Sequence, residues 1–301
     1  MTRPGSGRTA AATFFLPYVA PYHWAAMLDF LAARAVPATE QISGATYRRS
    51  LQVQPPGGPV LSGTASVSDE PRRQALRVEL SGGLAGGERS VIERIGRMFD
   101  VDCDPSAVAA VLGDLVGADR GLRLPGTVDP FEIAVRAILG QQVTVAAART
   151  IATRFVAAFG PELTQPQDER GPTRLFPPPC AIAGLEVRQL GELGIIRSRG
   201  EAIIALARAL SGGGLRLGAG APVEPTLAAL TAIRGIGPWT AHYIAMRALG
   251  WTDAFPPGDV VVLKALGVRS PAAAAALARR WQPWRSYAVL HLWRRSALRA
   301  T

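Results

Sequence analysis

Strand-like spacing of apolar residues is confined to the part of this 301-residue chain before about residue 89, and this limits the folds open to it. Before that point, TYRRSLQV (46–53) and QALRVEL (74–80) alternate apolar and polar residues, and PPGG at 55–58 marks a turn. Such alternation is typical of antiparallel strands that bury one face. From residue 89 onward, nearly every segment has helical spacing. We therefore predict an α+β fold that is mostly helical, with a small antiparallel sheet near the N-terminus.

The remaining helices and loops are predicted from the points at which these apolar patterns begin and end. An extended stretch, TFFLPYVAP, precedes an apolar helix that carries Trp24 and Met27 on one face. A long helical pattern breaks near 140–142 into two helices, where a glycine stands. A Pro-rich stretch at 164–180 is predicted to be a flexible insertion. Further helices are predicted at 186–210, 225–234, 238–249, 259–267, 271–281 and 283–298.

The charge of the chain is concentrated near its C-terminal end. The formal charge is +10, and residues 226–301 alone hold ten lysines and arginines against two aspartates, a net +8. A basic segment of this kind favours a polyanion partner, most often nucleic acid, while a solvated basic face is the alternative interpretation. No apolar run reaches the roughly 20 residues of a membrane helix, and no secretory signal is recognisable. We expect no membrane association and a cytoplasmic location.

Only two cysteines are present, Cys103 and Cys180. They are too few for a four-cysteine zinc or iron–sulfur site. We expect no metal and no cofactor. The low number fits a reducing compartment, with a single disulfide between the two as the alternative.

The stretch TAIRGIGPWTAHYIAMRAL (231–249) places Gly235 and Gly237 between two helical patterns. Glycine reaches positive φ and lets a ligand approach the backbone, and Pro238 suits the first turn of the following helix. The loop would present free amides at a helix N-terminus beside Arg234, which is an arrangement that binds anions such as a DNA phosphate. A bare Gly-x-Gly is more often an ordinary turn. With an apolar helix on each side, the pattern has the form of a helix-hairpin-helix DNA-binding element.

Asp259 begins the next helical pattern, directly after Pro-Pro-Gly. Aspartate is among the best N-cap residues, and that role alone would explain it. A fixed anion in a basic, DNA-facing region repels phosphate, however, so a second role is expected. Hydrolysis of an N-glycosidic bond builds positive charge on the sugar. A nearby carboxylate stabilises that charge and can orient or deprotonate the attacking water.

Aromatic residues gather in the same part of the chain. Trp239 and Tyr243 lie one helical turn apart, and the stretch RRWQPWRSYAVLHLWRR ends with Trp293. Aromatic residues at helical spacing are usually core residues, and most of these are expected to be. Flat aromatic faces also suit a base flipped out of the duplex, above all a cationic one.

Taken together, these motifs resemble those of a known protein family. Gly-Ile-Gly, followed about twenty residues later by Gly-Asp, resembles the helix-hairpin-helix (HhH-GPD) glycosylases of DNA base-excision repair. The chain resembles most their AlkA branch, the bacterial 3-methyladenine DNA glycosylases II. Four blocks carry this resemblance in order between about residues 14 and 295: APYHWAAMLDFLAARAV, GLRLPGTVDPFEIAVRAILGQQVTVAAAR, IRGIGPWTAHYIAMRALGW and RWQPWRSYAVLHLW.

The resemblance implies three subdomains and a site between the two helical ones. They are an N-terminal α+β subdomain (10–104), a helical domain (130–250) with the hairpin at about 225–249, and a second helical domain (105–129 plus 251–301). The implied catalytic residue is Asp259. The implied base pocket is formed by Trp239, Tyr243, Trp293 and Phe30. The implied DNA contacts are Gly235, Gly237, Arg234 and Gln142.

Two positions depart from the family pattern. The resemblance places at Gln142 the side chain that fills the gap left by a flipped base. The family's type member has leucine there, and glutamine offers less apolar contact. An aromatic residue that follows the catalytic aspartate in that member is replaced by Val260, which predicts a less aromatic pocket floor.

Some relatives also cut the DNA strand, using a lysine just after the hairpin glycines as a Schiff-base nucleophile. Here that place is Pro238-Trp239, and the only lysine of the chain, Lys264, matches no such position. We therefore predict a monomeric, monofunctional glycosylase without AP-lyase activity. It would excise 3-methyladenine, 7-methylguanine and related bases from double-stranded DNA of the bacterial nucleoid. The alternative is a non-catalytic helix-hairpin-helix DNA-binding protein.

Overall fold

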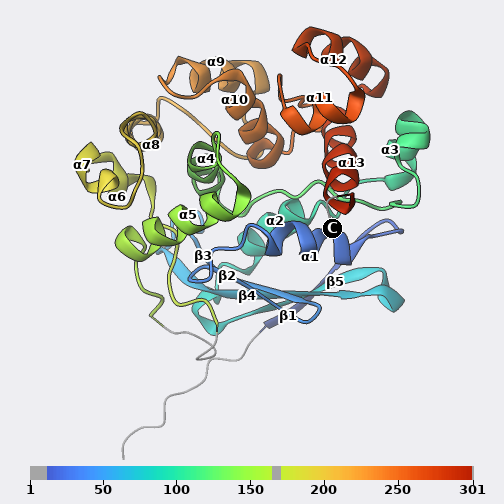
Figure 1. Cartoon of the computed structure of the whole chain (residues 1–301). Coiled ribbons are helices and arrows are strands. Elements are labelled where there is room, and N and C mark those ends of the chain that lie inside the picture. The colour runs from blue at the N-terminus through green and yellow to red at the C-terminus, as the bar shows by residue number, and fades with distance from the viewer. Residues whose placement is uncertain (1–11, 165–170, 300–301) are drawn as a thin grey trace, which may run out of the picture.

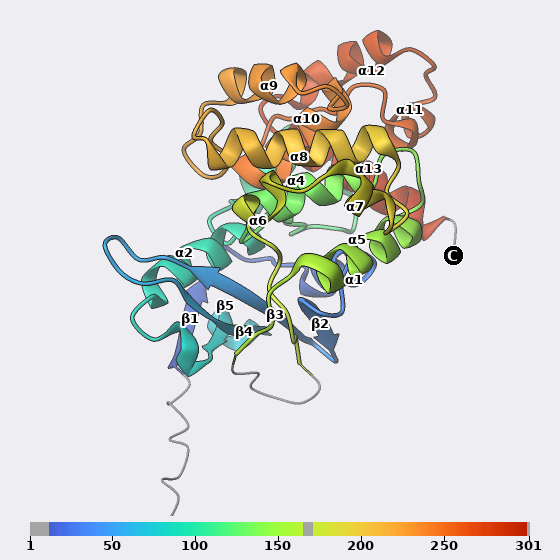
Figure 2. The same cartoon turned by 90° about the vertical axis from the view of Figure 1, so that its left-hand side faces the viewer.

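A computed structural model describes residues 12–164 and 171–299 of the chain, and the two predicted kinds of structure occupy different layers (Figure 1). The sheet forms one side of the molecule. Helices α1 (Trp24–Ala32) and α2 (Glu88–Phe99) lie on it, and in both views they stand between the sheet and the other helices (Figure 2). The predicted α+β class, mostly helical with a small N-terminal sheet, is confirmed.

The sheet is antiparallel and has five strands in the order β1-β5-β4-β3-β2. The predicted strands at 46–53 and 74–80 are β3 and β5, and they lie on either side of β4. The extended N-terminal stretch adds an edge strand beside β5. The bounds are β1 Ala12–Pro17, β2 Glu40–Ser43, β3 Thr46–Val53, β4 Leu61–Glu70 and β5 Ala75–Leu80.

Alternation along these strands buries one face beneath α1 and α2. Val67 and Val78 are directly opposite each other on β4 and β5, and both are fully buried. Trp24 of α1 and Phe99 of α2 belong to the same apolar cluster, and their rings are tilted by 41° with centroids 5.3 Å apart. Burial of aromatic rings of this size dominates the stability of such a layer.

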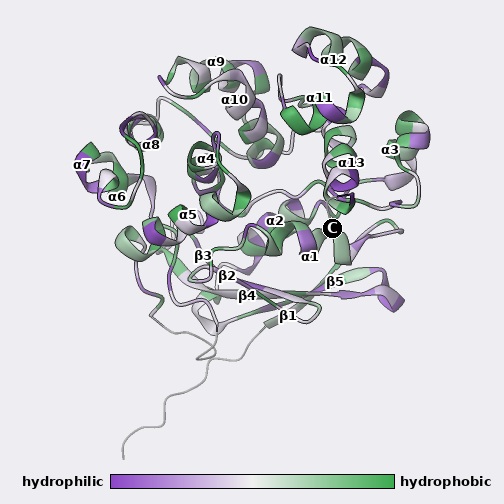
Figure 3. Ribbon diagram, in the orientation of Figure 1, coloured by the Kyte–Doolittle hydropathy of each residue, from purple (hydrophilic) through white to green (hydrophobic). Residues whose placement is uncertain are grey.

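Helix α4 (Pro130–Leu139) lies at the centre of the helical layer, where it packs against α5, α8 and α10. Asp129 caps its N-terminus. The predicted break after it is present at 140–144. Figure 3 shows apolar and polar residues along α8 and α12, as expected of helices with one covered side. The elements of this cluster are α5 Val145–Phe159, α6 Pro179–Ala183, α7 Val187–Gly191, α8 Arg197–Ser211, α9 Val223–Ala232 and α10 Pro238–Ile244, with a π-helical turn at Ala245–Leu249.

A third apolar cluster joins one early helix to the C-terminal helices. Trp281 and Tyr287 are buried in it beside Met246 from the turn after α10. The chain therefore returns to residues near 105–116 after passing through the whole helical layer. The elements here are α3 Pro105–Leu112, α11 Val260–Leu266, α12 Pro271–Ala278 and α13 Arg285–Leu298.

The Pro-rich stretch differs from its prediction where the structure describes it. Residues 165–170 lie outside the described residues. Beyond them, Phe176 is 5% exposed and stands near Phe131 and Phe155, with ring centroids 6.1 and 5.7 Å away. The amides of Thr173 and Arg174 both donate to the carbonyl of residue 38. The segment after residue 170 is thus anchored to the packed core by the buried Leu175 and Phe176, although most residues of the Pro-rich stretch are polar or proline.

Both cysteines are free thiols, Cys103 buried and Cys180 exposed, so the alternative disulfide is absent. Among the described residues, no single helix has the length and apolar character needed to cross a membrane. The pair Val260–Leu266 and Pro271–Trp281 meets that test of length and composition only when joined across a 67° bend.

The buried ring of Phe176 generates a test of this packing. We expect Phe176→Ala to lower the free energy of unfolding by about 3–5 kcal/mol, as for other buried aromatic residues replaced by alanine. Phe15→Ala is the matched control, because that ring is 42% exposed. Urea denaturation of both variants measures the difference. Equal losses for the two would show that residues 171–180 do not anchor the core.

Candidate active site

A cavity of about 530 Å³ opens where the three apolar clusters meet, a volume typical of small-ligand sites. Helices α1, α4, α5, α10, α11 and α13 all contribute to its wall. Four of the predicted site residues line it together, although up to 54 positions separate them along the chain: Trp239, Tyr243, Asp259 and Trp293.

Asp259 is held from three directions. As N-cap of α11 it accepts a hydrogen bond from the amide of Val262 through Oδ1, at 2.9 Å. The indole of Trp293 donates to the same oxygen at 3.1 Å, and the indole of Trp239 donates to Oδ2 at 3.0 Å. The residue is 6% exposed, and no basic side chain among the described residues pairs with it. Its orientation is therefore fixed by neutral donors, which leave its charge uncompensated.

The aromatic side chains form a continuous wall beside this carboxylate. Trp239 and Tyr243 stack with their ring planes 8° apart and their centroids at 5.3 Å. Trp293 of α13 stands 6.1 Å from Tyr243 at an angle of 44°. One-turn spacing on α10 produces the stacked pair, because residues four apart share a helix face.

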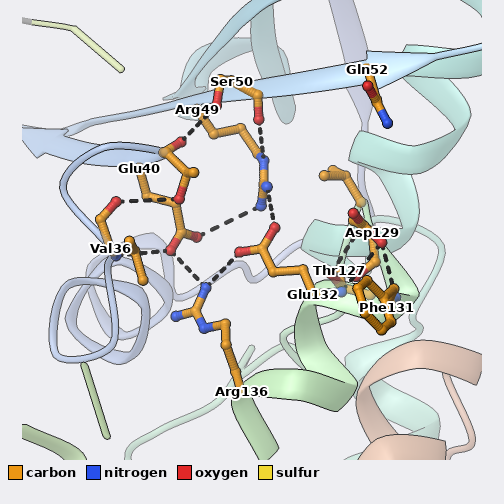
Figure 4. Close-up of polar contacts among 12 residues, drawn as sticks. Val36, Glu40, Arg49, Ser50, Gln52, Thr127, Asp129, Phe131, Glu132 and Arg136 are labelled. Atoms are coloured by element: carbon orange, nitrogen blue, oxygen red, sulfur yellow. Dashed lines mark hydrogen bonds and ion pairs between the residues drawn. The ribbon is translucent and has the colours of Figure 1, made fainter. Parts of the chain in front are cut away.

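A buried network of charges also lines the cavity (Figure 4). Arg136 of α4 donates to Glu40 and to Glu132, both at 2.8 Å. Arg49 of β3 pairs with Glu132 at 2.6 Å, and the hydroxyl of Tyr47 donates to Glu40 at 2.5 Å. Burial opposes ionisation of Glu40, but the neighbouring guanidiniums outweigh it and lower the pKa of the carboxyl. This network was not predicted from the sequence.

Besides the exposed Arg149 of α5, two further arginines line the cavity without a carboxylate partner among the described residues. Arg247 donates to the carbonyls of Pro125 and Gly126 and to the hydroxyl of Tyr243, the last at 2.8 Å. Arg34, two residues beyond the end of α1, donates to the carbonyl of Phe30. The cavity wall thus carries the carboxylate of Asp259 and the guanidiniums of these arginines.

The hairpin has the predicted form, with one difference. Ile236 is buried, whereas Arg234 and both glycines are exposed. Gly235 has φ +94°, and a Cβ there would lie 3.1 Å from the Cβ of Ala202. Gly237 has φ −84°, so the expectation of a positive φ is wrong there. A Cβ on Gly237 would meet nothing within 4 Å, which leaves the surface above the first turn of α10 open.

Gln142 lies in the loop after α4, exposed and with φ +53°. That left-handed conformation is uncommon for a residue with a side chain and often marks a functional loop. Gln141, which the sequence did not single out, donates through Nε2 to the carbonyl of Gly235 at 2.9 Å and to Thr240 at 3.0 Å. The loop and the hairpin are thereby fastened to each other.

Two predicted pocket positions lie elsewhere. Phe30 lines an adjoining cavity of about 180 Å³, where the guanidinium of Arg34 covers its ring at 3.8 Å. Val260 is 77% exposed and does not line the main cavity, while the following residue, Val261, does. The predicted effect of Val260 on the pocket floor is therefore wrong, because the first residue after the N-cap points outward.

Other chemical groups are distant from this cavity. Lys264 is exposed on α11 and is not among the lining residues. Burial lowers the pKa of His291 to about 4, so this imidazole is neutral at pH 7. Within 12–164 and 171–299 there is no group of three or more His, Cys, Asp or Glu side chains that could hold a metal ion.

Comparison with known families agrees with this architecture. Residues 13–129 match the AlkA N-terminal domain, and residues 135–270 match the HhH-GPD superfamily of base excision DNA repair proteins. The chain belongs to the HhH-GPD superfamily and carries the AlkA N-terminal domain in front of it. The family resemblance seen in the sequence is thus confirmed.

Individual relatives cover most of the chain. DNA-3-methyladenine glycosylase 2 of Escherichia coli is 38% identical over 93% of this chain and 96% of its own length. DNA-3-methyladenine glycosylase of Bacillus subtilis is 34% identical over 68% of this chain and 71% of its own. Among solved structures, the 3-methyladenine DNA glycosylase from Archaeoglobus fulgidus shares the fold with a TM-score of 0.76. It is 20% identical and is matched over 93% of this chain and 96% of that one.

The two hairpin glycines provide a matched pair for testing the loop geometry. We expect Gly235→Ala to destabilise the protein by about 1–3 kcal/mol, since an alanine at positive φ is strained and its methyl group would crowd Ala202. Gly237→Ala should change the free energy of unfolding by less than about 0.5 kcal/mol, as surface substitutions usually do. Thermal unfolding monitored by circular dichroism compares them. A larger effect at Gly237 would contradict the loop geometry.

Proposed function

We propose that this chain is a monofunctional DNA glycosylase that excises alkylated bases, including 3-methyladenine and 7-methylguanine, from double-stranded DNA. The observation that carries the proposal is the oriented, uncompensated carboxylate of Asp259 inside an aromatic cavity. Cleavage of an N-glycosidic bond leaves positive charge on the sugar, and such a carboxylate stabilises it and can orient the attacking water. The named relatives are glycosylases of 3-methyladenine, which supports this substrate class.

Binding of DNA is assigned to the exposed hairpin and the loop beside it. The amides at the start of α10 and the side chain of Arg234 would contact phosphates. Gln142, held in its loop by the neighbouring Gln141, would enter the duplex where the damaged base leaves. Because Gln141 connects the loop to the hairpin, the two contacts would keep a fixed separation along the DNA.

The released base would be held by the stacked wall of the cavity. Bases alkylated at N3 or N7 are cationic in DNA, and aromatic faces attract cations. They are also good leaving groups, so stabilisation of the sugar by Asp259 is sufficient for them. Phe30 would contribute from the adjoining cavity, through the arginine that covers its ring.

We further propose that the enzyme acts as a monomer on chromosomal DNA in the bacterial cytoplasm. All the residues assigned to the site come from one chain. The three apolar clusters support the division into subdomains at 10–104, 130–250 and 105–129 plus 251–301. The cavity lies between them, so their relative placement would govern the site.

Replacement of Asp259 tests the catalytic role. We expect Asp259→Asn to lower the release of 3-methyladenine and 7-methylguanine from methylated DNA by about 10²- to 10³-fold, because an electrostatic stabiliser is lost. Folding should persist, since asparagine is an equally good N-cap. Chromatography of released bases gives the rate, and gel shift gives DNA binding. Asp102→Asn, at an exposed aspartate, is the control for loss of charge.

Two outcomes would contradict the proposal. Near-normal turnover by Asp259→Asn would remove the aspartate from the mechanism. A wild-type protein that binds methylated DNA and releases no base would be the non-catalytic helix-hairpin-helix protein that is the alternative.

The absence of strand cleavage is a separate prediction. No lysine lines the cavity in the described part of the chain, and a Schiff base requires an amine next to the sugar. We therefore expect borohydride to trap no covalent protein–DNA adduct during turnover. A bifunctional glycosylase assayed alongside provides the positive control. A trapped adduct that forms with the wild-type protein and does not form with Lys264→Met would overturn this prediction.

A further inference from the structure

The structure points to a second chemical role within the same cavity, on the base side of the bond. We infer that the hydroxyl of Tyr243 donates a hydrogen bond, and then its proton, to the departing base, and that it is the leaving-group residue for uncharged bases. This inference rests on the proposed function and assigns a residue to the base side of the bond, where the carboxylate does not act.

The hydrogen bonding of this hydroxyl leaves its proton available. Arg247 donates to the phenolic oxygen at 2.8 Å, and a guanidinium can only donate. The oxygen is therefore used as an acceptor there, and its own hydrogen needs a different partner. None of the described protein atoms accepts it, and the residue lines the main cavity. The hydrogen is thus available to a molecule in the cavity.

The surrounding charges make this phenol a stronger donor than usual. Guanidiniums face it from three segments: Arg247 in the π-helical turn after α10, Arg34 just beyond the end of α1, and Arg136 on α4. Burial alone would raise the pKa of Tyr243, but the three cations outweigh burial and lower it. Of the three, Arg136 is paired with Glu40 and Glu132. The other two have no carboxylate partner in the described ranges, so their charge acts on the phenol.

The chemistry of the leaving base decides when such a donor matters. When the bond between C1′ and the base nitrogen breaks, its electron pair stays on the nitrogen. A base methylated at N3 or N7 starts as a cation and departs neutral. An uncharged purine departs as an anion unless it receives a proton, and general acids at such positions contribute about 10²- to 10⁴-fold.

The proposed step balances without any further reactant. The phenol passes its proton to an acceptor atom of the uncharged base, and the phenolate stays between Arg34 and Arg247. Water adds to C1′ beside Asp259 and loses one proton, which returns to the phenolate through solvent. The products are the free base and an abasic sugar, and the tyrosine is regenerated.

The single-atom change Tyr243→Phe separates this role from stacking, because it keeps the ring. Duplexes with one 7-methylguanine or one hypoxanthine, a cationic and an uncharged purine, would be compared under single-turnover conditions. We expect hypoxanthine release to fall by at least about 10²-fold, and to fall much further than 7-methylguanine release, because the cationic base needs no proton from the hydroxyl. Wild-type hypoxanthine release should also decline on the alkaline side, below the ordinary pKa of tyrosine, and this limb should be missing in the variant.

Arg34→Met provides a second measurement that does not alter the tyrosine. Loss of one facing cation should move the alkaline decline of hypoxanthine release to higher pH, and this shift in pH is the readout whatever the substitution does to the rate of 7-methylguanine release. Circular dichroism and binding to an abasic-site duplex control for folding. Equal losses on both bases in Tyr243→Phe, or an unshifted limb in Arg34→Met, would overturn the inference.

The wild-type protein separates this inference from the proposed function. Release of 7-methylguanine without any release of hypoxanthine would overturn the role of the hydroxyl and leave the alkylated-base glycosylase standing. Release of neither base would refute the proposed function itself.

Discussion

The buried contact between the sheet and helix α4 is the constraint on which the site depends. Arg49 on β3 and Arg136 on α4 share Glu132, and Glu40 on β2 completes the network. Removing one partner of a buried ion pair costs about 3–5 kcal/mol, because the other charge is left uncompensated. The sheet and α4 are therefore held in one arrangement. Since α4 leads directly into the loop of Gln141, and Gln141 binds the hairpin, that arrangement extends from the sheet to the surface assigned to DNA.

Local patterns predicted most of the fold, and long-range pairing explains what they missed. Period-two spacing identified β3 and β5, and the glycines with Pro238 identified the hairpin, because these signals act within a few residues. Glu132 and Arg136 stand four apart on a helix, which is equally typical of an exposed ion pair. Their burial depends on Arg49, 83 residues earlier. No local pattern contains that information, so the network could be found only in the folded chain.

For the candidate site as well, local features were predicted from the sequence, whereas contacts between distant segments were not. The N-cap position of Asp259 followed from the preceding Pro-Pro-Gly, and the shared helix face of Trp239 and Tyr243 followed from their spacing. The contact of both indoles with the carboxylate depends on how α10 and α13 are placed around the start of α11, which spacing does not specify. The same limit explains Val260: the resemblance gave its place in the chain, but the direction of its side chain is set by the turn that begins α11.

The distribution of charge in the cavity follows the charge separation of the proposed reaction. Heterolysis of an N-glycosidic bond leaves positive charge on the sugar and electrons on the base. The carboxylate of Asp259 is oriented by indoles and an amide, which fix its geometry without cancelling its charge. In the same cavity wall, Arg34 and Arg247 have no carboxylate partner among the described residues, so they too retain their charge. Preorganised charges of this kind require no rearrangement as the bond breaks, and inside a protein they act through a lower dielectric than water. In the proposed mechanism a cationic base gains from the carboxylate alone, whereas an uncharged base also needs the hydroxyl that the arginines surround.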